Sequence, residues 1–138
     1  MQPFLTFLII LVLLSPQVHA RIGEDYSKCR DRYGDLYIKY DGDHGSEYAL
    51  FEVSVFKINV TLWNGYVHRI AYGKASAFSE AEIAYMLKVN GDGREWLRNA
   101  RSCWRTRDGK LSAVRRSNGS VVIYTSDYED HHSRLQKP

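Results

Sequence analysis

The stretch YALFEVSVFKINVTLWNGYVHRIAYGK, residues 48–74, decides the fold expected for this chain. Apolar and polar residues alternate on both sides of the turn sequence WNG, residues 63–65, as in two antiparallel strands that bury one face. A two-residue loop at the Asn-Gly pair would set Val60 opposite Arg69 and mix apolar with polar residues on each face. We therefore predict a three-residue loop with Gly65 in the left-handed conformation, which brings apolar residues together by pairing Ile58 with Ile70, Phe56 with Tyr72 and Leu62 with Tyr66.

Two short amphipathic helices are expected, one before this hairpin and one after it. Residues 22–33 carry a single apolar stripe and are followed by Gly34, where a helix would end. The stripe consists of Ile22, Tyr26, Cys29 and Tyr33. The second helix begins with a capping box and a hydrophobic staple and ends at Asn90-Gly91. These two motifs are formed by Ser79 with Glu82 and by Phe78 with Ile83.

Three strand-like runs follow each helix. They are residues 36–40, 48–62 and 66–74 in the first half and residues 102–107, 110–116 and 120–126 in the second, where an extra turn at 93–100 precedes them. The apolar parity of the second run changes between Val55 and Phe56, which predicts a β-bulge. The expected fold class is α+β: two helix-plus-three-strand units, an internal repeat of pattern, whose antiparallel sheet or sheets carry the helices on one face.

The domain organisation follows from the same pattern. Residues 21–128 are expected to form one α+β domain, with halves 21–76 and 77–128 if the repeat holds, and residues 129–138 a flexible tail. The preceding residues 1–20 have an apolar run from Phe4 to Leu14 and end with Val18-His19-Ala20, which predicts a signal peptide cleaved after Ala20. An N-terminal membrane anchor is the alternative. The mature chain is expected to be secreted or periplasmic, with no transmembrane segment.

The two cysteines, Cys29 and Cys103, are predicted to form a disulfide, because two thiols in an oxidising compartment are usually paired. Such a bond would stabilise the fold by about 4 kcal/mol. The alternative is two buried thiols that act as small apolar core residues. Neither cysteine lies in a CxxC or Cys/His spacing, so no metal site is predicted there.

Positive charge is concentrated between residues 94 and 116. Eight basic residues there face only Glu95 and Asp108, which leaves the segment at +6 in a chain of net charge +3. Besides Lys110, the basic residues are Arg94, Arg98, Arg101, Arg105, Arg107, Arg115 and Arg116. Because arginine forms bidentate contacts with anions, the segment is predicted to bind an acidic protein or an anionic envelope component, not nucleic acid. The alternative is a solvated face, with Trp104 either a binding anchor or a buried core residue.

Sequence motifs of catalysis are missing. There is no GxSxG, HExxH or phosphate loop, so no catalytic residue and no cofactor are predicted, although scattered residues could still assemble a site. His68 is expected to be hydrogen-bonded at the edge of the core, and His44 lies in a loop without the ligand spacing of an EF-hand. The run Asp130-His131-His132 is expected to belong to an exposed tail, and the alternative is a weak metal-binding site. The sequons at Asn59 and Asn118 are expected at exposed positions.

Three segments carry a resemblance to other proteins: CRDRYGD at 29–35, SEAEIAYMLKVNG at 79–91 and WRTRDGKLSAV at 104–114. On these, the chain resembles small exported bacterial proteins of uncharacterised function. Its plan is also similar to tandem helix-plus-sheet modules such as beta-lactamase inhibitor proteins, in which a concave sheet binds another protein. The resemblance implies an exported, non-enzymatic binding module or inhibitor that acts on a protein or an anionic envelope partner. The alternatives are an envelope-associated structural protein and a secreted hydrolase with an unrecognised site.

Overall fold

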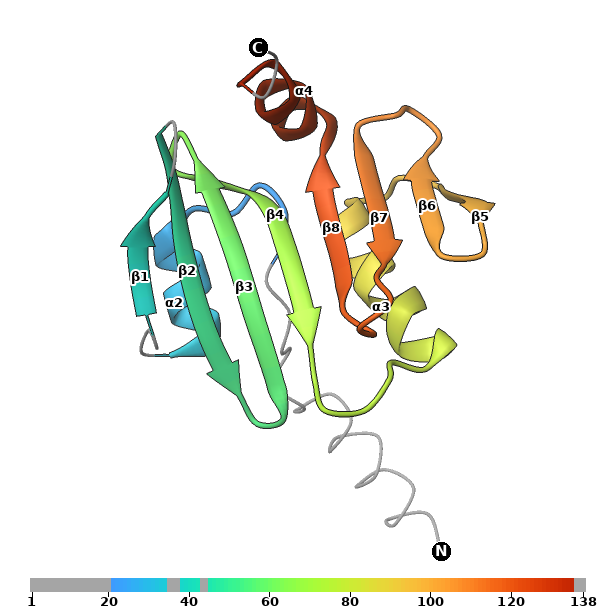
Figure 1. Cartoon of the computed structure of the whole chain (residues 1–138), viewed down its shortest axis with the longest axis horizontal. Coiled ribbons are helices and arrows are strands. Elements are labelled where there is room, and N and C mark those ends of the chain that lie inside the picture. Colours follow the sequence, from blue (N-terminus) through green and yellow to red (C-terminus); the bar gives the residue numbers. More distant parts are fainter. Residues whose placement is uncertain (1–20, 35–37, 43–44, 136–138) are drawn as a thin grey trace, which may run out of the picture.

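A computed structural model describes residues 21–34, 38–42 and 45–135, which build one eight-stranded antiparallel sheet with the strand order β1-β2-β3-β4-β8-β7-β6-β5 (Figure 1). The elements in chain order are α2 (Tyr26–Tyr33), β1 (Ile38–Asp41), β2 (Ser46–Val53), β3 (Phe56–Trp63), β4 (Tyr66–Gly73), α3 (Glu80–Gly91), β5 (Trp96–Ala100), β6 (Cys103–Thr106), β7 (Leu111–Arg115), β8 (Val121–Thr125) and α4 (Ser126–Leu135). Two four-stranded meanders therefore join where β4 pairs with β8.

The helices α2 and α3 lie behind the sheet in Figure 1, and α4 lies at the end of β8. Contacts join α2 to β2, α3 to β8, and α4 to both β8 and β4. The core lies between the sheet and the first two helices. Its members include Cys29, Ile83, Met86 and Leu87 from the helices and Phe51, Ile58, Val60, Ile70, Tyr72, Val121 and Ile123 from the strands.

The prediction of two helix-plus-three-strand units is wrong, because α2 and α3 are each followed by four strands and all eight strands belong to one sheet. The run 48–62 is not one bulged strand: it is cut by a two-residue turn at Ser54-Val55, with Ser54 at φ +55°. The expected extra turn at 93–100 is largely the strand β5, which pairs with β6. The turn between β2 and β3 was missed because Ser54-Val55 lacks glycine, asparagine and proline, the usual signals of a turn. The segment 93–100 likewise carries no clear strand signal.

The register predicted for the WNG hairpin is also wrong. Asn64 and Gly65, at φ +54° and +81°, form a two-residue turn of the kind that suits a hairpin, and Trp63 pairs with Tyr66. An irregularity further along the strands, between Thr61 and Leu62, then shifts the register by one residue. Beyond it, the paired residues are Val60 with Ile70 and Ile58 with Tyr72, so the apolar face is preserved by a bulge instead of by the turn.

The predicted end of α2 and the predicted start of α3 are confirmed, but α2 begins at Tyr26, so Ile22 of the predicted stripe precedes the helix. Cys29 is buried, as expected for the apolar stripe of α2, and Gly34 ends that helix at φ +78°. Both hydrogen bonds of the α3 capping box are present: the Glu82 N–H donates to Ser79 Oγ at 3.1 Å, and the Ser79 N–H donates to Glu82 Oε1 at 3.0 Å.

The predicted disulfide is absent, because Cys29 and Cys103 are both free thiols. Cys29 is buried on α2, which contacts β2, whereas Cys103 begins β6, five strand positions away in the sheet. Five strand spacings amount to about 24 Å, while a disulfide needs Cα atoms within about 7 Å. Cys103 is also exposed, and its neighbour Trp104 is the residue that faces the core.

The chain from residue 129 on, expected to be a flexible tail, is helical as far as Leu135. The helix α4 begins directly after β8, and the Tyr128 N–H donates to Thr125 Oγ1 at 3.1 Å across its first turn. The predicted signal peptide, residues 1–20, and His44 lie outside the described residues.

Candidate functional site

The sheet face turned away from α2 and α3, here called the open face, carries one row of side chains that crosses all eight strands. Successive register partners define this row, and each partner belongs to the next strand of the sheet. Its members are Tyr40, Tyr48, Thr61, Arg69, Tyr124, Ser112, Arg105 and Leu97. Their sequence neighbours, such as Ala49, Ile70 and Ile123, are buried in the core, as strand alternation requires.

Residues of α4 and of the open face together line a hollow of about 450 Å³, here called the α4 hollow. The lining residues are Tyr48, Arg69, Val114, Arg116, Val122 and Tyr124 from the sheet side and Tyr128, Glu129, His132 and Ser133 from α4. The helix is fixed there partly by Tyr128, which is buried and hydrogen-bonded to the hydroxyl of Tyr48.

Two guanidinium groups, those of Arg69 and Arg116, line the α4 hollow, and no carboxylate within residues 21–34, 38–42 and 45–135 forms an ion pair with either. Burial lowers the pKa of Arg69, and the positive charge of Arg116 lowers it further. The ion pairs among the described residues involve other basic side chains, namely Arg32, Lys39, Lys74, Arg94, Arg98, Arg107 and Arg115. Burial also raises the pKa of Tyr124 and of Tyr128, so both hydroxyls stay protonated and can donate hydrogen bonds.

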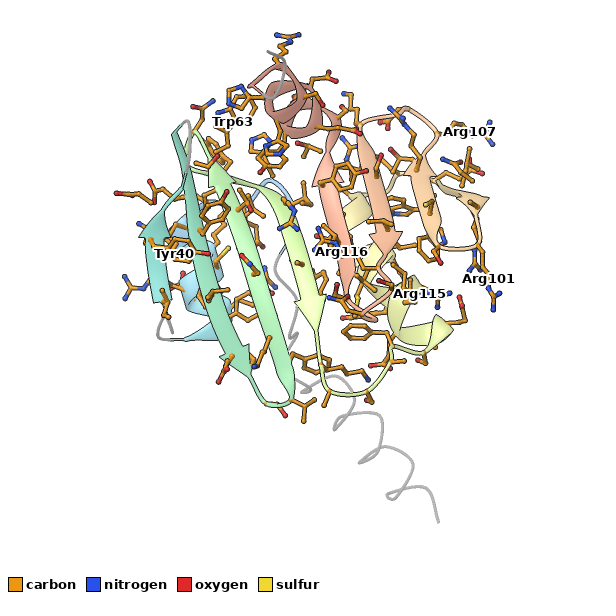
Figure 2. The ribbon with its side chains drawn as sticks, in the orientation of Figure 1. Tyr40, Trp63, Arg101, Arg107, Arg115 and Arg116 are labelled. Atoms are coloured by element: carbon orange, nitrogen blue, oxygen red, sulfur yellow. The ribbon has the colours of Figure 1, made fainter. Side chains whose placement is uncertain are left out.

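The arginines between residues 94 and 116 do not share one face. Arg98 and Arg115 both reach Glu80 on α3, at 3.6 and 3.3 Å, on the helix-covered side. Figure 2 shows the labelled members apart: Arg101 and Arg107 at the β5–β6 edge, Arg115 beside α3, and Arg116 near the middle of the sheet.

Two further arginines of this segment are bound to acids that the segment itself supplies. Arg94 pairs with Asp108 at 2.9 Å and Arg107 with Glu95 at 2.7 Å. Trp104 is buried with Arg98 stacked 4.9 Å from its ring centroid, so it is a core residue and not a binding anchor. Of the predicted basic surface, the strand register places Arg105 on the open face, and Arg116 lines the α4 hollow there.

Histidines and one tryptophan join α4 to the hairpin end of the sheet. The rings of Trp63 and His131 stack at 4.3 Å, and Trp63 also meets His68 at 5.1 Å. His68 Nδ1 lies 2.8 Å from Thr125 Oγ1, which confirms the prediction of a hydrogen-bonded histidine at the core edge. No group of three metal-ligating side chains occurs in the described ranges, and the His131 and His132 rings are engaged in stacking.

A larger cavity of about 590 Å³ lies between the N-terminal segment, the end of α3 and the start of α4. Charges of both signs line it: Arg21, Lys28, Arg94 and Lys110 with Glu24, Asp92 and Asp127. The basic residues exceed the acidic ones by one, as they do in the α4 hollow, and Arg94 is paired with Asp108 at 2.9 Å. The α4 hollow is the better candidate site, because no carboxylate of the described residues is paired with either of its arginines.

Sequence reasoning missed Arg69, Tyr48 and Tyr128, the residues that define the α4 hollow. The abundance of tyrosine was the available signal, but it did not indicate which tyrosines would meet. The expectation for the Asn59 sequon is wrong as well. Asn59 is half-buried on β3 and Thr61 is fully buried, whereas Asn118 is exposed in the turn before β8.

None of the helices in the described part of the chain has both the length and the apolar character needed to cross a membrane. No protein-family model and no curated protein matches the chain. The fold is similar to that of a cysteine-rich secretory protein from Staphylococcus aureus subsp. aureus Mu50, with a TM-score of 0.52 and 12% sequence identity. The likeness covers 78% of this chain and 45% of that protein, so this chain spans less than half of its length, and at such identity it concerns the fold alone.

Proposed function

We propose that the chain is an exported, non-enzymatic binding module whose open face takes an acidic protein partner. The observation that carries the proposal is the row of tyrosine and arginine side chains across the open face. The charged members of this row are Arg69 and Arg105, and Arg116 lies on the same face. The acidic Glu52 on this face is the register partner of Lys57, and Glu129 lines the α4 hollow, so the three arginines outnumber the one remaining acidic side chain.

The composition of the open face favours a protein partner over a small molecule. Tyrosine and arginine are enriched at the energetic centres of protein interfaces because they combine a large contact area with polar tips. Tyr40 is 45% exposed and packs 5.1 Å from the ring of Tyr48, and Ile38 and Leu97 are exposed on the two edge strands. The eight strands span about 34 Å, a width that suits a macromolecular contact.

Export is part of the proposal for two reasons. Residues 1–20 have the apolar run and the small residues typical of a signal peptide. The structurally similar protein is itself described as secretory. The free thiols do not oppose export, since Cys29 is buried and no partner cysteine lies near it.

The test is capture of a partner by immobilised residues 21–138 from the native envelope or secreted fraction, with charge reversals on opposite sides of the molecule. Arg105→Glu places a negative charge in the row on the open face, and Arg30→Glu makes the same change at an exposed position of α2. We expect the first variant to lose the captured protein and the second to retain it, with retention falling as salt rises. Equal capture by both variants would refute the assignment of the open face.

A further inference from the structure

The α4 hollow brings two cationic side chains together from either side of β8. Arg69 comes from the middle of β4, directly opposite Tyr124 of β8, and Arg116 follows the end of β7. The register partners Val114 and Val122 lie between them and form an apolar floor. A ligand that enters the hollow would therefore meet a guanidinium on each side and methyl groups below.

The charges that line the α4 hollow are unbalanced. Two guanidiniums face one carboxylate, that of Glu129, and no ion pair within 4.0 Å joins Glu129 to either arginine among the described residues. Arg69 is partly withdrawn from water and repelled by Arg116, a combination that an anion between them would relieve. The two arginines and Glu129 give the lining a formal charge of +1, which matches a singly charged anion better than a dianion.

Two tyrosine hydroxyls from opposite sides of the hollow differ in their availability to a ligand. Tyr128 donates its hydroxyl proton to Tyr48, so it offers no proton to a ligand. The hydroxyl of Tyr124 stays protonated because burial raises its pKa, and it can donate a hydrogen bond to an anion in the hollow.

We propose that Arg69 and Arg116 form a seat for one carboxylate of the partner, an aspartate or glutamate side chain presented by a segment that lies across the open face. This inference rests on the proposed function and specifies the partner's anchoring group. The planar fork of each guanidinium fits a carboxylate bidentately, and the valine floor accepts the methylene groups of the same side chain. The Tyr124 hydroxyl supplies a further donor.

The probe is the tripeptide acetyl-Tyr-Glu-Tyr-amide, whose only charge is one side-chain carboxylate, compared with acetyl-Tyr-Gln-Tyr-amide and with inorganic phosphate. Each is titrated into residues 21–138 labelled with ¹⁵N, and the shifts of the arginine Nε–H signals give the dissociation constants. We expect the Glu peptide to bind at least tenfold more tightly than the Gln peptide and than phosphate, with shifts at Arg69 and Arg116.

Three variants define where the probe binds. Arg69→Gln and Arg116→Gln are each expected to weaken binding of the Glu peptide at least tenfold, whereas Arg115→Gln, which removes the adjacent charge on the helix-covered side, is expected to leave it unchanged. Because Arg116 is exposed, its variant is informative even if Arg69→Gln does not fold. Equal binding of the two peptides, phosphate binding as tight as the Glu peptide, or binding that survives Arg116→Gln would each overturn the seat.

The failure of this inference is distinguishable from failure of the proposed function. A captured partner that is lost with Arg105→Glu but kept with both Arg69→Gln and Arg116→Gln would leave the open face as the interface and reject the carboxylate seat. A Glu peptide that binds at Arg69 and Arg116, with capture indifferent to Arg105→Glu, would support the seat and reject the open face as a protein interface.

Discussion

Replacing Asn90 with alanine is expected to destabilise the fold by about 3 kcal/mol. Asn90 is 4% exposed on α3 and connects three parts of the molecule. Its Oδ1 accepts from the Ile22 N–H at 3.0 Å, and its Nδ2 donates to the Tyr72 hydroxyl at 3.0 Å and to the Met86 carbonyl at 2.8 Å. A buried hydrogen bond between neutral groups contributes about 1 kcal/mol, so loss of all three gives the estimate.

The assay is urea unfolding followed by circular dichroism, with the free energy of unfolding compared between wild type, Asn90→Ala and Asn118→Ala. The control Asn118 also accepts hydrogen bonds, from the N–H and hydroxyl of Ser120, but it lies in an exposed turn where water replaces them. We expect Asn118→Ala to change stability by less than about 0.5 kcal/mol. An Asn90→Ala variant as stable as the control would refute the view that this side chain ties the N-terminal segment and α3 to the sheet.

Three further outcomes are expected. A thiol reagent should titrate one cysteine in the native protein and both in denaturant, because Cys103 is exposed while burial protects Cys29 and raises its pKa to about 12. Two cysteines that stay unreactive until a reductant is added would show that they form a disulfide after all. Burial lowers the pKa of His68 in the fold, although Asp127 opposes the shift. The contribution of this histidine to the free energy of unfolding should therefore stay constant above the unfolded pKa of about 6.5 and decrease as the pH falls below it. His68→Gln should flatten that pH dependence in urea titrations at about pH 5 to 8, and an unaltered slope would contradict the prediction. Tyr128→Phe removes the hydrogen bond to Tyr48, so amide hydrogen exchange should become faster in α4 and stay unchanged in α3. An equal effect of the variant on the exchange rates of both helices would show that this bond does not hold α4.

The helices could be predicted because their signals are local. The Ser79 and Glu82 capping box needs only three residues of sequence separation, and both of its bonds form. The strands failed where the local signal was weak. Ser54 adopts a left-handed backbone that glycine or asparagine usually provides, so the turn between β2 and β3 is imposed by the pairing of the flanking strands and not by its own residues.

The cysteines show a different limit. Both lie at positions that local patterns assign to a helix stripe and to a strand, and each assignment is correct. Their separation depends on the order of strands in the sheet, which places α2 against β2 and leaves β6 beyond β7. Strand order is a property of the whole chain, and the segments around Cys29 and Cys103 do not reveal it. The one local signal against the bond was strand alternation, because a core-facing Trp104 turns Cys103 to the opposite face.

The bulge at His68 connects the error in register to the candidate site. In a regular strand, Val67 facing the core would be followed by His68 on the open face and by Arg69 on the core side, because alternate side chains point to opposite faces. The extra residue at the bulge restores Ile70 to the core and turns Arg69 onto the open face, opposite Tyr124. This one bulge therefore keeps Ile70 in the core and also places Arg69 in the lining of the α4 hollow. Bulges commonly redirect side chains next to functional sites.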